Sequence, residues 1–475
     1  AFSAFPFTED EIQTSPAFLK NRKIRGKLSS MPLQTLFRST LLLLACCLPA
    51  WTASPSPAAF QPSEWAALQS PRADRRHTSS RGIVQTMLEQ VRPACAFQPG
   101  MPPENFPSWR EQVRQAMKKL MKFPASQEIQ PPRLVKTVPR QGYRVEKWES
   151  YPFPNAAVPF LVLVPDSATP QRPVPVLFCI PGSDQTKEEL AAETSAELEN
   201  APLPRPGPNA MAWHYVREGW VAVVVDNAGA GEQGDAERAA GRASNDYDNL
   251  ARLLLEMDWS WLGYTSYTDQ CILDWVKKLP FIQKNHIILS GFSLGTEPMM
   301  VLGVLNPDIY AFVYNDFLCR TLERAQTMAK PSSNGSRPAP NSIRRLVPGF
   351  RQEIGFPDIV ASLAPRPVIC TEGGLDRDFG FIAQAYRMAG REDAFRFLHQ
   401  PRFADPAKRW QGERLPSGLD RTEFFRLANV DPRNHFFKKD AVIPWIKSLL
   451  NAEQTAERPA DSQQPAVAAE SPATP

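Results

Sequence analysis

The chain has 475 residues, of which 43% are hydrophobic and 22% are charged, as is typical of a globular protein. Its net charge is only +4 at pH 7. No dense basic patch with interleaved aromatic residues occurs, which argues against nucleic acid as a partner. The 48 prolines are about twice the average usage and indicate linkers and rigid surface turns.

The N-terminal region carries a candidate export signal. Residues 1–30 look like neither a signal nor a domain, so they are an upstream extension of unclear role, and Met31 is a candidate start. Residues 31–53 combine a mildly positive segment with an apolar run too short to span a bilayer, which predicts a secretory signal. Two outcomes remain open: cleavage near Ala53, or a lipid on Cys46, since Leu43–Cys46 resembles a lipobox. The expected location is outside the cell or in the cell envelope, with Cys46 as the one membrane link.

The rest of the chain divides into a linker, a folded domain and a tail. Residues 54–105 are rich in Pro, Ser and Ala and predict a linker, residues 106–450 predict the domain, and residues 451–475 predict a disordered tail. Within the domain, apolar runs and helical patterns alternate, which predicts a mostly parallel sheet covered by helices on both faces. In chain order the expected elements are a helix at 109–121, a hairpin of strands at 143–153 and 157–164, strands at 174–180 and 220–226, a helix at 267–279, strands at 286–290, 310–317, 367–371 and 394–398, and an amphipathic stretch at 440–450.

A G-x-S-x-G pattern follows the strand at 286–290. In Gly291-Phe292-Ser293-Leu294-Gly295 the glycines permit a sharp strand-to-helix turn that exposes the Ser293 hydroxyl. The backbone N–H of Leu294 can then help to bind an oxyanion. The pattern therefore predicts Ser293 as a nucleophile.

A nucleophilic serine needs a base, and two histidines follow it in the chain. His435 lies in a loop that leads into the amphipathic stretch at 440–450, whereas His399 lies within or just after a strand-like run. A histidine in a strand is more often structural, so we favour His435 and keep His399 as the alternative.

The acid that orients the base is expected after a strand between the serine and the histidine. The strand at 367–371 runs into a glycine turn followed by Asp376, which we predict as the acid. Asp378 and Glu372 are the alternatives. Taken alone, Asp376 would be a turn carboxylate that caps its own backbone.

These motifs resemble the α/β-hydrolase superfamily, and more narrowly the secreted bacterial hydrolases grouped with acetyl xylan esterases and dienelactone-hydrolase-like proteins. The resemblance covers roughly residues 140–450. It implies the α/β-hydrolase fold and a triad of Ser293, Asp376 and His435. Lipase-like relatives carry His-Gly in the oxyanion loop, where this chain has Pro181-Gly182, so the second oxyanion donor stays open between the backbone N–H groups of Ser183 and Asp184. The stretches that carry the resemblance are 181–189, 226–232, 291–298, 372–378 and 429–438.

Three functions compete. The first is an enzyme, a serine hydrolase of carboxylic esters whose partner is a small-molecule or carbohydrate ester such as acetylated xylan. The second is a prolyl-oligopeptidase-like peptidase, although fewer than about 150 residues precede the domain's strands, too few for a β-propeller. The third is a non-catalytic binding protein on a hydrolase scaffold.

Other patterns are weaker. No C-x-x-C or H-E-x-x-H occurs, so we expect no metal and no cofactor. Residues 229–234 match G-x-G-x-x-G, but the helix and acid-ending strand of a dinucleotide site do not follow, which favours a glycine-rich turn. The aromatic residues at 259–267 fit a buried cluster better than a sugar platform. Residues 321–356 form either a segment that covers the active site and shapes its specificity or an ordinary surface loop.

Overall fold

The computed structural model describes residues 68–125, 130–195, 197–198, 206–234, 246–320, 323–324, 327–328 and 346–456. All of them belong to the compact unit Phe60–Pro475. The predicted signal at 31–53, with Cys46, lies outside the described residues, as does most of the predicted tail at 451–475. Among the described helices, none combines the length and the hydropathy that crossing a bilayer requires.

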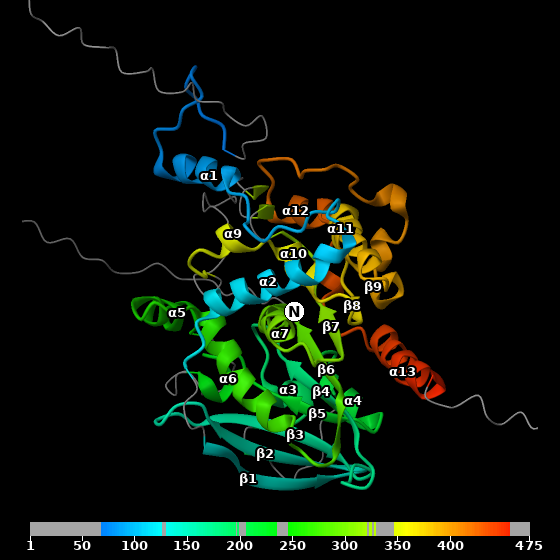
Figure 1. Cartoon of the computed structure of the whole chain (residues 1–475). Coiled ribbons are helices and arrows are strands. Elements are labelled where there is room, and N and C mark those ends of the chain that lie inside the picture. Colours follow the sequence, from blue (N-terminus) through cyan, green and yellow to red (C-terminus); the bar gives the residue numbers. More distant parts are fainter. Residues whose placement is uncertain are drawn as a thin grey trace, which may run out of the picture. The chain divides into compact units, whose positions relative to one another are not determined.

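A mixed sheet of nine strands forms the centre of the unit, in the order β1-β2-β3-β5-β4-β6-β7-β8-β9 (Figure 1). The pairs β1–β2, β2–β3 and β3–β5 are antiparallel, and the remaining neighbours are parallel. The strands are β1 (Gln130–Arg140), β2 (Tyr143–Tyr151), β3 (Val158–Pro165), β4 (Val174–Ile180), β5 (Val221–Val224), β6 (Ile282–Phe292), β7 (Ala311–Asn315), β8 (Val368–Cys370) and β9 (Phe395–Phe397).

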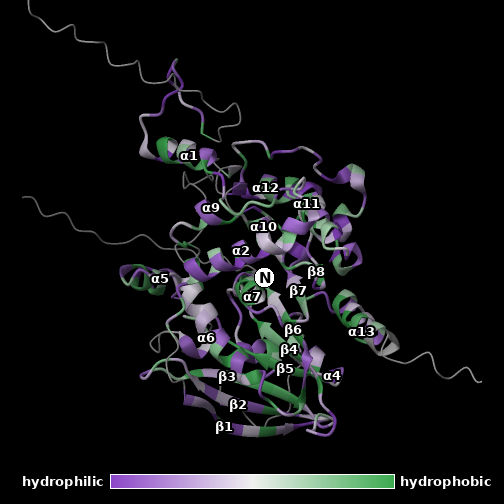
Figure 2. Ribbon diagram, in the orientation of Figure 1, coloured by the Kyte–Doolittle hydropathy of each residue, from purple (hydrophilic) through white to green (hydrophobic). Residues whose placement is uncertain are grey.

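The central strands are apolar because both of their faces are covered. In β4, Phe178 and Ile180 join the hydrophobic cluster on one face, while Leu177 and Cys179 join the cluster on the other. Strands that are buried on both sides read as continuous apolar runs, whereas the edge strand β1 is largely exposed. Figure 2 shows this concentration of hydrophobic residues in the central strands.

Helices cover both faces of the sheet. One face packs against α2 (Phe106–Met121), α5 (Tyr247–Glu256), α6 (Trp261–Val276), α7 (Thr296–Leu305), α10 (Phe356–Ser362) and α11 (Asp376–Met388). The other packs against α3 (Lys187–Ala191), α4 (Met211–Arg217) and α13 (Lys439–Ala456). A third, smaller cluster lies around α12 (Arg421–Leu427). Two further helices in the described part of the chain are α1 (Ser80–Gln90) and α9 (Phe350–Glu353), and short 3-10 turns join several elements.

The expected strands and helices of the domain are present, with ends shifted by a few residues. The expected linker at 54–105 needs correction in its second half. Residues 80–90 form α1, and Phe97 is buried against Phe106, Trp109 and Phe381. The Phe97 N–H also donates to the Asp358 carboxylate at 2.8 Å. The segment before α2 is therefore part of the folded unit, because one aromatic anchor and a buried backbone bond fix it to α10.

Candidate active site

The site lies at the carboxyl ends of the parallel strands, where their register brings consecutive residues together. Ile180 of β4 pairs with Gly291 of β6, and Phe292 of β6 pairs with Asn315 of β7. One strand further, Tyr314 of β7 pairs with Cys370 of β8. The residues just past these ends therefore meet at one edge of the sheet, as in other open α/β sheets. They include Ser293, Asp316 and Glu372.

Ser293 stands on a strained turn between β6 and α7. Its φ is 50°, in the left-handed region that a serine seldom adopts. Strain of this kind costs about 1–3 kcal/mol and gathers at functional positions. The flanking glycines are needed for close approach: a Cβ on Gly291 would lie 2.5 Å from the Gly295 carbonyl oxygen, and a Cβ on Gly295 would meet the carbonyl of Ile180. The turn expected from the G-x-S-x-G pattern is present.

Replacing Gly295 by alanine is expected to destabilise the protein by about 1–3 kcal/mol, the usual range for overpacking. The added methyl would meet backbone atoms of Ile180 and Pro181, which cannot turn aside as a side chain can. Thermal unfolding checks this. The matched control is Gly380→Ala in α11, where an added Cβ meets nothing within 4 Å. A melting temperature as high for Gly295→Ala as for Gly380→Ala would contradict the tight packing of the turn.

The loop between α12 and α13 carries His435 and is fastened at several points. The Phe437 N–H donates to Asn209 Oδ1 at 2.9 Å, and the Phe437 ring is 2% exposed. The Lys438 N–H donates to Asn315 Oδ1 at 3.2 Å, which ties the loop to the end of β7. The ring of Phe292, the residue before Ser293, packs against the imidazole with 4.7 Å between centroids. These contacts hold His435 beside the turn that presents Ser293.

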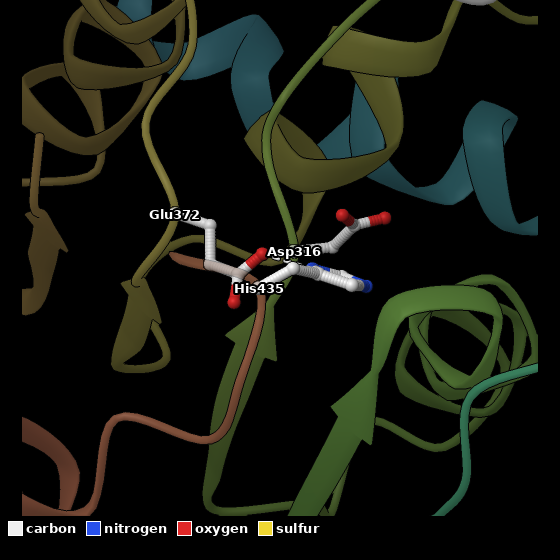
Figure 3. Close-up of side chains that lie close together, drawn as sticks. All are labelled: Asp316, Glu372 and His435. Carbon is white, nitrogen blue, oxygen red and sulfur yellow. Dashed lines mark hydrogen bonds and ion pairs between the residues drawn. The ribbon is translucent and has the colours of Figure 1, made fainter. Parts of the chain in front are cut away.

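His435 forms a short contact with a buried carboxylate. Its Nδ1 lies 2.5 Å from Glu372 Oε2, and the Glu372 side chain is 1% exposed while the imidazole is 36% exposed (Figure 3). Burial lowers the pKa of His435, but the hydrogen bond and charge of Glu372, with the charge of Asp316, raise it by more, so the pKa lies above its ordinary 6.5. With the proton on Nδ1, Nε2 is left as the basic nitrogen.

The other oxygen of Glu372 is held by Lys438. The ammonium lies 2.9 Å from Glu372 Oε1, and it also donates to the carbonyl oxygens of Asn434 at 2.7 Å and Phe436 at 2.5 Å. A buried carboxylate is stable only when it is paired and hydrogen-bonded. Lys438 therefore pairs with Glu372 and fixes the orientation of its carboxylate.

The expectation for Asp376 is corrected by the structure, which does not bring it to His435. Asp376 begins α11, where its Oδ1 lies 2.9 Å from His399 Nε2 and its Oδ2 lies 3.3 Å from Arg409 Nε. The glycines at 373 and 374, with φ of 84° and 146°, turn the chain away after Glu372. The imidazole of His399, the alternative base, is 8% exposed and packs edge-on against Phe379. Of the three candidate acids, Glu372, named as an alternative, is the one that meets His435.

Asp378, the other alternative acid, is buried elsewhere. Its Oδ1 lies 2.7 Å from Arg320 Nε and 3.5 Å from Arg377 Nε. Burial raises the pKa of Asp378 against the charges of these two arginines. The pair Arg320–Asp378 connects the chain after β7 to α11, which is a structural role.

The loop after β4 carries the expected oxyanion donors Ser183 and Asp184, and hydrogen bonds from two side chains to its backbone carbonyls hold it in place. Asn227 Nδ2 donates to the Pro181 carbonyl at 2.8 Å, and the Tyr247 hydroxyl donates to the Ser183 carbonyl at 2.8 Å. Because Gly295 packs on Ile180 and Pro181, the loop lies next to the turn of Ser293 and Leu294. The oxyanion roles of Leu294, Ser183 and Asp184 stay predictions.

A buried ion cluster ties this loop to the glycine-rich turn at 229–234. Lys187 Nζ is fully buried and lies 2.7 Å from Asp226 Oδ2, 2.6 Å from Glu232 Oε2 and 2.8 Å from Glu188 Oε1. Burial raises the pKa of Asp226 to about 6, although Lys187 opposes the shift. A Cβ on Gly231 would lie about 2.5 Å from the Asp226 carboxylate, so the glycine lets the turn cross this cluster. The ion cluster supports the turn interpretation of the G-x-G-x-x-G match.

The aromatic residues at 259–267 form a packed cluster, as expected. Trp261 is fully buried and its Nε1 donates to the Ala228 carbonyl at 2.8 Å, while Trp259 Nε1 donates to the Met121 carbonyl at 2.8 Å. Tyr264 stacks on Phe153. Their large apolar area holds α6 to α2 and to the hairpin.

Comparison with known families identifies the class of protein. The sequence profile described as the Abhydrolase family matches residues 59–448. The strained serine turn and the parallel sheet that carries it agree with this match. The chain therefore belongs to the α/β-hydrolase family. No curated protein gave a match.

Among solved structures, a protein from Bacteroides fragilis NCTC 9343 described as a candidate acetyl xylan esterase shares 49% identity with this chain, with a TM-score of 0.75. The match covers 80% of this chain and 97% of that one. Two weaker likenesses, on which no argument rests, are to methylesterase BT1017 (16% identity, 75% and 76% covered, TM-score 0.41) and to acetyl xylan esterase 1 from Thermoanaerobacterium sp. JW/SL YS485 (14% identity, 63% and 90% covered, TM-score 0.38).

Proposed function

We propose that the protein is a secreted serine hydrolase that removes acyl groups, acetyl first among them, from an esterified carbohydrate. The observation that carries the proposal is the pair of His435 and buried Glu372 next to the strained turn of Ser293. The relative described as a candidate acetyl xylan esterase supports the choice of substrate. Export rests on the signal pattern at 31–53.

The proposed mechanism uses Ser293, His435 and Glu372 as the triad. Nε2 of His435 takes the proton of the Ser293 hydroxyl as its oxygen attacks the ester carbonyl carbon. Glu372 holds the proton on Nδ1 and stabilises the imidazolium that forms. The N–H of Leu294, with one from Ser183 or Asp184, binds the oxyanion. His435 then protonates the leaving alcohol, and water releases the acid through the same base.

An assay of acetate release from acetylated xylo-oligosaccharides tests the substrate class. We expect steady turnover of the acetylated sugars, and none of a proline-containing peptide amide, because the proposal assigns an esterase rather than a peptidase. The control is a Ser293→Ala preparation, which accounts for contaminating esterases. Turnover of the peptide without turnover of any acetylated sugar or short acyl ester would contradict the proposal.

The pH dependence of ester hydrolysis follows from the raised pKa of His435. The base is active only when the imidazole is neutral, so kcat/KM is expected to fall about tenfold per pH unit below that pKa. Since Glu372 and Asp316 raise the pKa above 6.5, the fall begins at a pH above that value. A pH profile of kcat/KM measures this. A profile that stays flat down to pH 5 would contradict a histidine base in this environment.

A further inference from the structure

A second carboxylate faces the imidazole of His435. Asp316 follows β7 directly. One carboxylate oxygen of Asp316, one of Glu372 and one ring nitrogen of His435 all lie within 4.8 Å of one another. Figure 3 shows the side chains of Glu372 and Asp316 near the imidazole, coming from separate strand ends. Asp316 is half-buried, so water does not fully screen its charge. The mechanism above gives Asp316 no part.

The position of Asp316 is fixed by its backbone surroundings. Its Oδ1 accepts a hydrogen bond of 2.8 Å from the N–H of Phe317. The preceding residue, Asn315, accepts from the Lys438 N–H and donates to the Phe436 carbonyl at 3.4 Å. The end of β7 therefore holds the histidine loop with one residue and presents a carboxylate to its imidazole with the next.

Three charged groups of the described residues act on His435, namely those of Glu372, Asp316 and Lys438. Their placement makes Asp316 a second source of negative charge at the imidazole. Lys438 lies on Glu372 Oε1 and partly neutralises that carboxylate. Burial lowers the pKa of His435 and Lys438 lowers it further, whereas Glu372 and Asp316 raise it. The ammonium on Glu372 also argues against a metal ion among these ligands, because it would face a second cation at close range. The remaining negative charge that faces the imidazole belongs to Asp316.

We propose that Asp316 is a positioning residue for the base: with Glu372 it stabilises the His435 imidazolium that forms when Ser293 loses its proton. This inference rests on the proposed function. Two acids that follow neighbouring strands, β7 and β8, then serve one histidine. When Glu372 alone is lost, Asp316 still stabilises part of the positive charge on the imidazolium.

The variant Asp316→Asn tests the proposal, because an asparagine Oδ1 can still accept the hydrogen bond from Phe317 while the charge is removed. The matched control is Asp308→Asn, which removes an exposed carboxylate from the opposite end of β7. In the pH profile of kcat/KM, we expect Asp316→Asn to move the fall on the acid side to a pH about one unit lower. We also expect the constant value of kcat/KM at higher pH to be reduced about tenfold. The imidazole pKa of His435, measured by NMR without substrate, shifts in parallel. Asp308→Asn leaves both unchanged.

The double variant with Glu372→Gln provides a second readout. If Asp316 takes over part of the support, its loss costs more in the Glu372→Gln background than in the wild type. An NMR pKa of His435 that is the same in Asp316→Asn as in the wild type would overturn the inference. So would equal losses of activity in Asp316→Asn and Asp316→Glu, since the second keeps the charge. Failure of the proposed function itself is distinguishable: the wild type would then hydrolyse no ester, or Ser293→Ala would hydrolyse it as fast, whereas the NMR pKa of His435 is measured without substrate.

Discussion

Replacing Ser293 by alanine is expected to reduce kcat for ester hydrolysis by at least about 10⁴-fold, because the groups of a triad act as a unit and little remains when the nucleophile is lost. The substitution removes one hydroxyl from the turn between β6 and α7. Alanine must adopt the same left-handed backbone as serine at this position, where φ is 50°, so the strain of the turn is unchanged. The folded structure should therefore persist. Initial rates with a short acyl ester, together with the melting temperature, measure the two effects separately.

The matched control for this variant is Ser448→Ala. Ser448 lies on the exposed side of α13, where its hydroxyl donates to the Trp445 carbonyl. Activity within about twofold of the wild type is expected there, as for most surface substitutions. A Ser293→Ala enzyme that keeps its activity would show that another group attacks the ester, or that the measured hydrolysis comes from another protein.

Replacing Glu372 by glutamine is expected to reduce kcat on the order of 10³-fold, since an amide can neither fix the proton on Nδ1 nor stabilise the imidazolium. Replacing Asp376 by asparagine is expected to cost less than about threefold, as for a residue outside the catalytic unit. The two carboxylates lie four positions apart, and the structure gives Glu372 to His435 and Asp376 to His399. The comparison of these two variants therefore decides which acid serves the base.

The Glu372→Gln variant also removes the ion pair with Lys438, so its folding needs a check. A large fall in melting temperature would mix a loss of stability with the loss of catalysis, and the double variant Glu372→Gln, Lys438→Met then separates them by removing the unpaired ammonium as well. A larger loss of kcat in Asp376→Asn than in Glu372→Gln would contradict the assignment.

The sequence was sufficient to predict the central strands, the sharp turn at Ser293 and, of the two histidines, the one that lies beside that turn, because these depend on apolar runs, a glycine-framed serine and chain order. The catalytic roles of Ser293 and His435 stay predictions. It was not sufficient to choose between Glu372 and Asp376, since both follow the same strand. The choice depends on the backbone at Gly373 and Gly374, which leaves Glu372 at the end of β8 and carries Asp376 into α11. A carboxylate one or two residues past a strand is the signal that favours Glu372.

Two parts of the fold were missed for different physical reasons. The strand β1 contains three prolines within Gln130–Arg140, which argue against a central strand but are tolerated at a sheet edge. The segment before α2 is polar and proline-rich, yet the burial of Phe97 and its bond to Asp358 attach it to the core. The attachment of Phe97 depends on contacts between residues far apart in the chain, which local composition does not contain, whereas β1 pairs with β2 in a local hairpin that its prolines obscure.

The measurement that tests the central claim most directly is reaction of the purified protein with a fluorophosphonate, followed by mapping of the modified peptide. An activated serine is required for this reaction, so the label is expected on Ser293 in the wild type and is expected to be lost in His435→Ala. Both proteins should show the same thermal unfolding. Labelling of a different serine, or undiminished labelling of Ser293 without His435, would contradict the account that His435 activates Ser293.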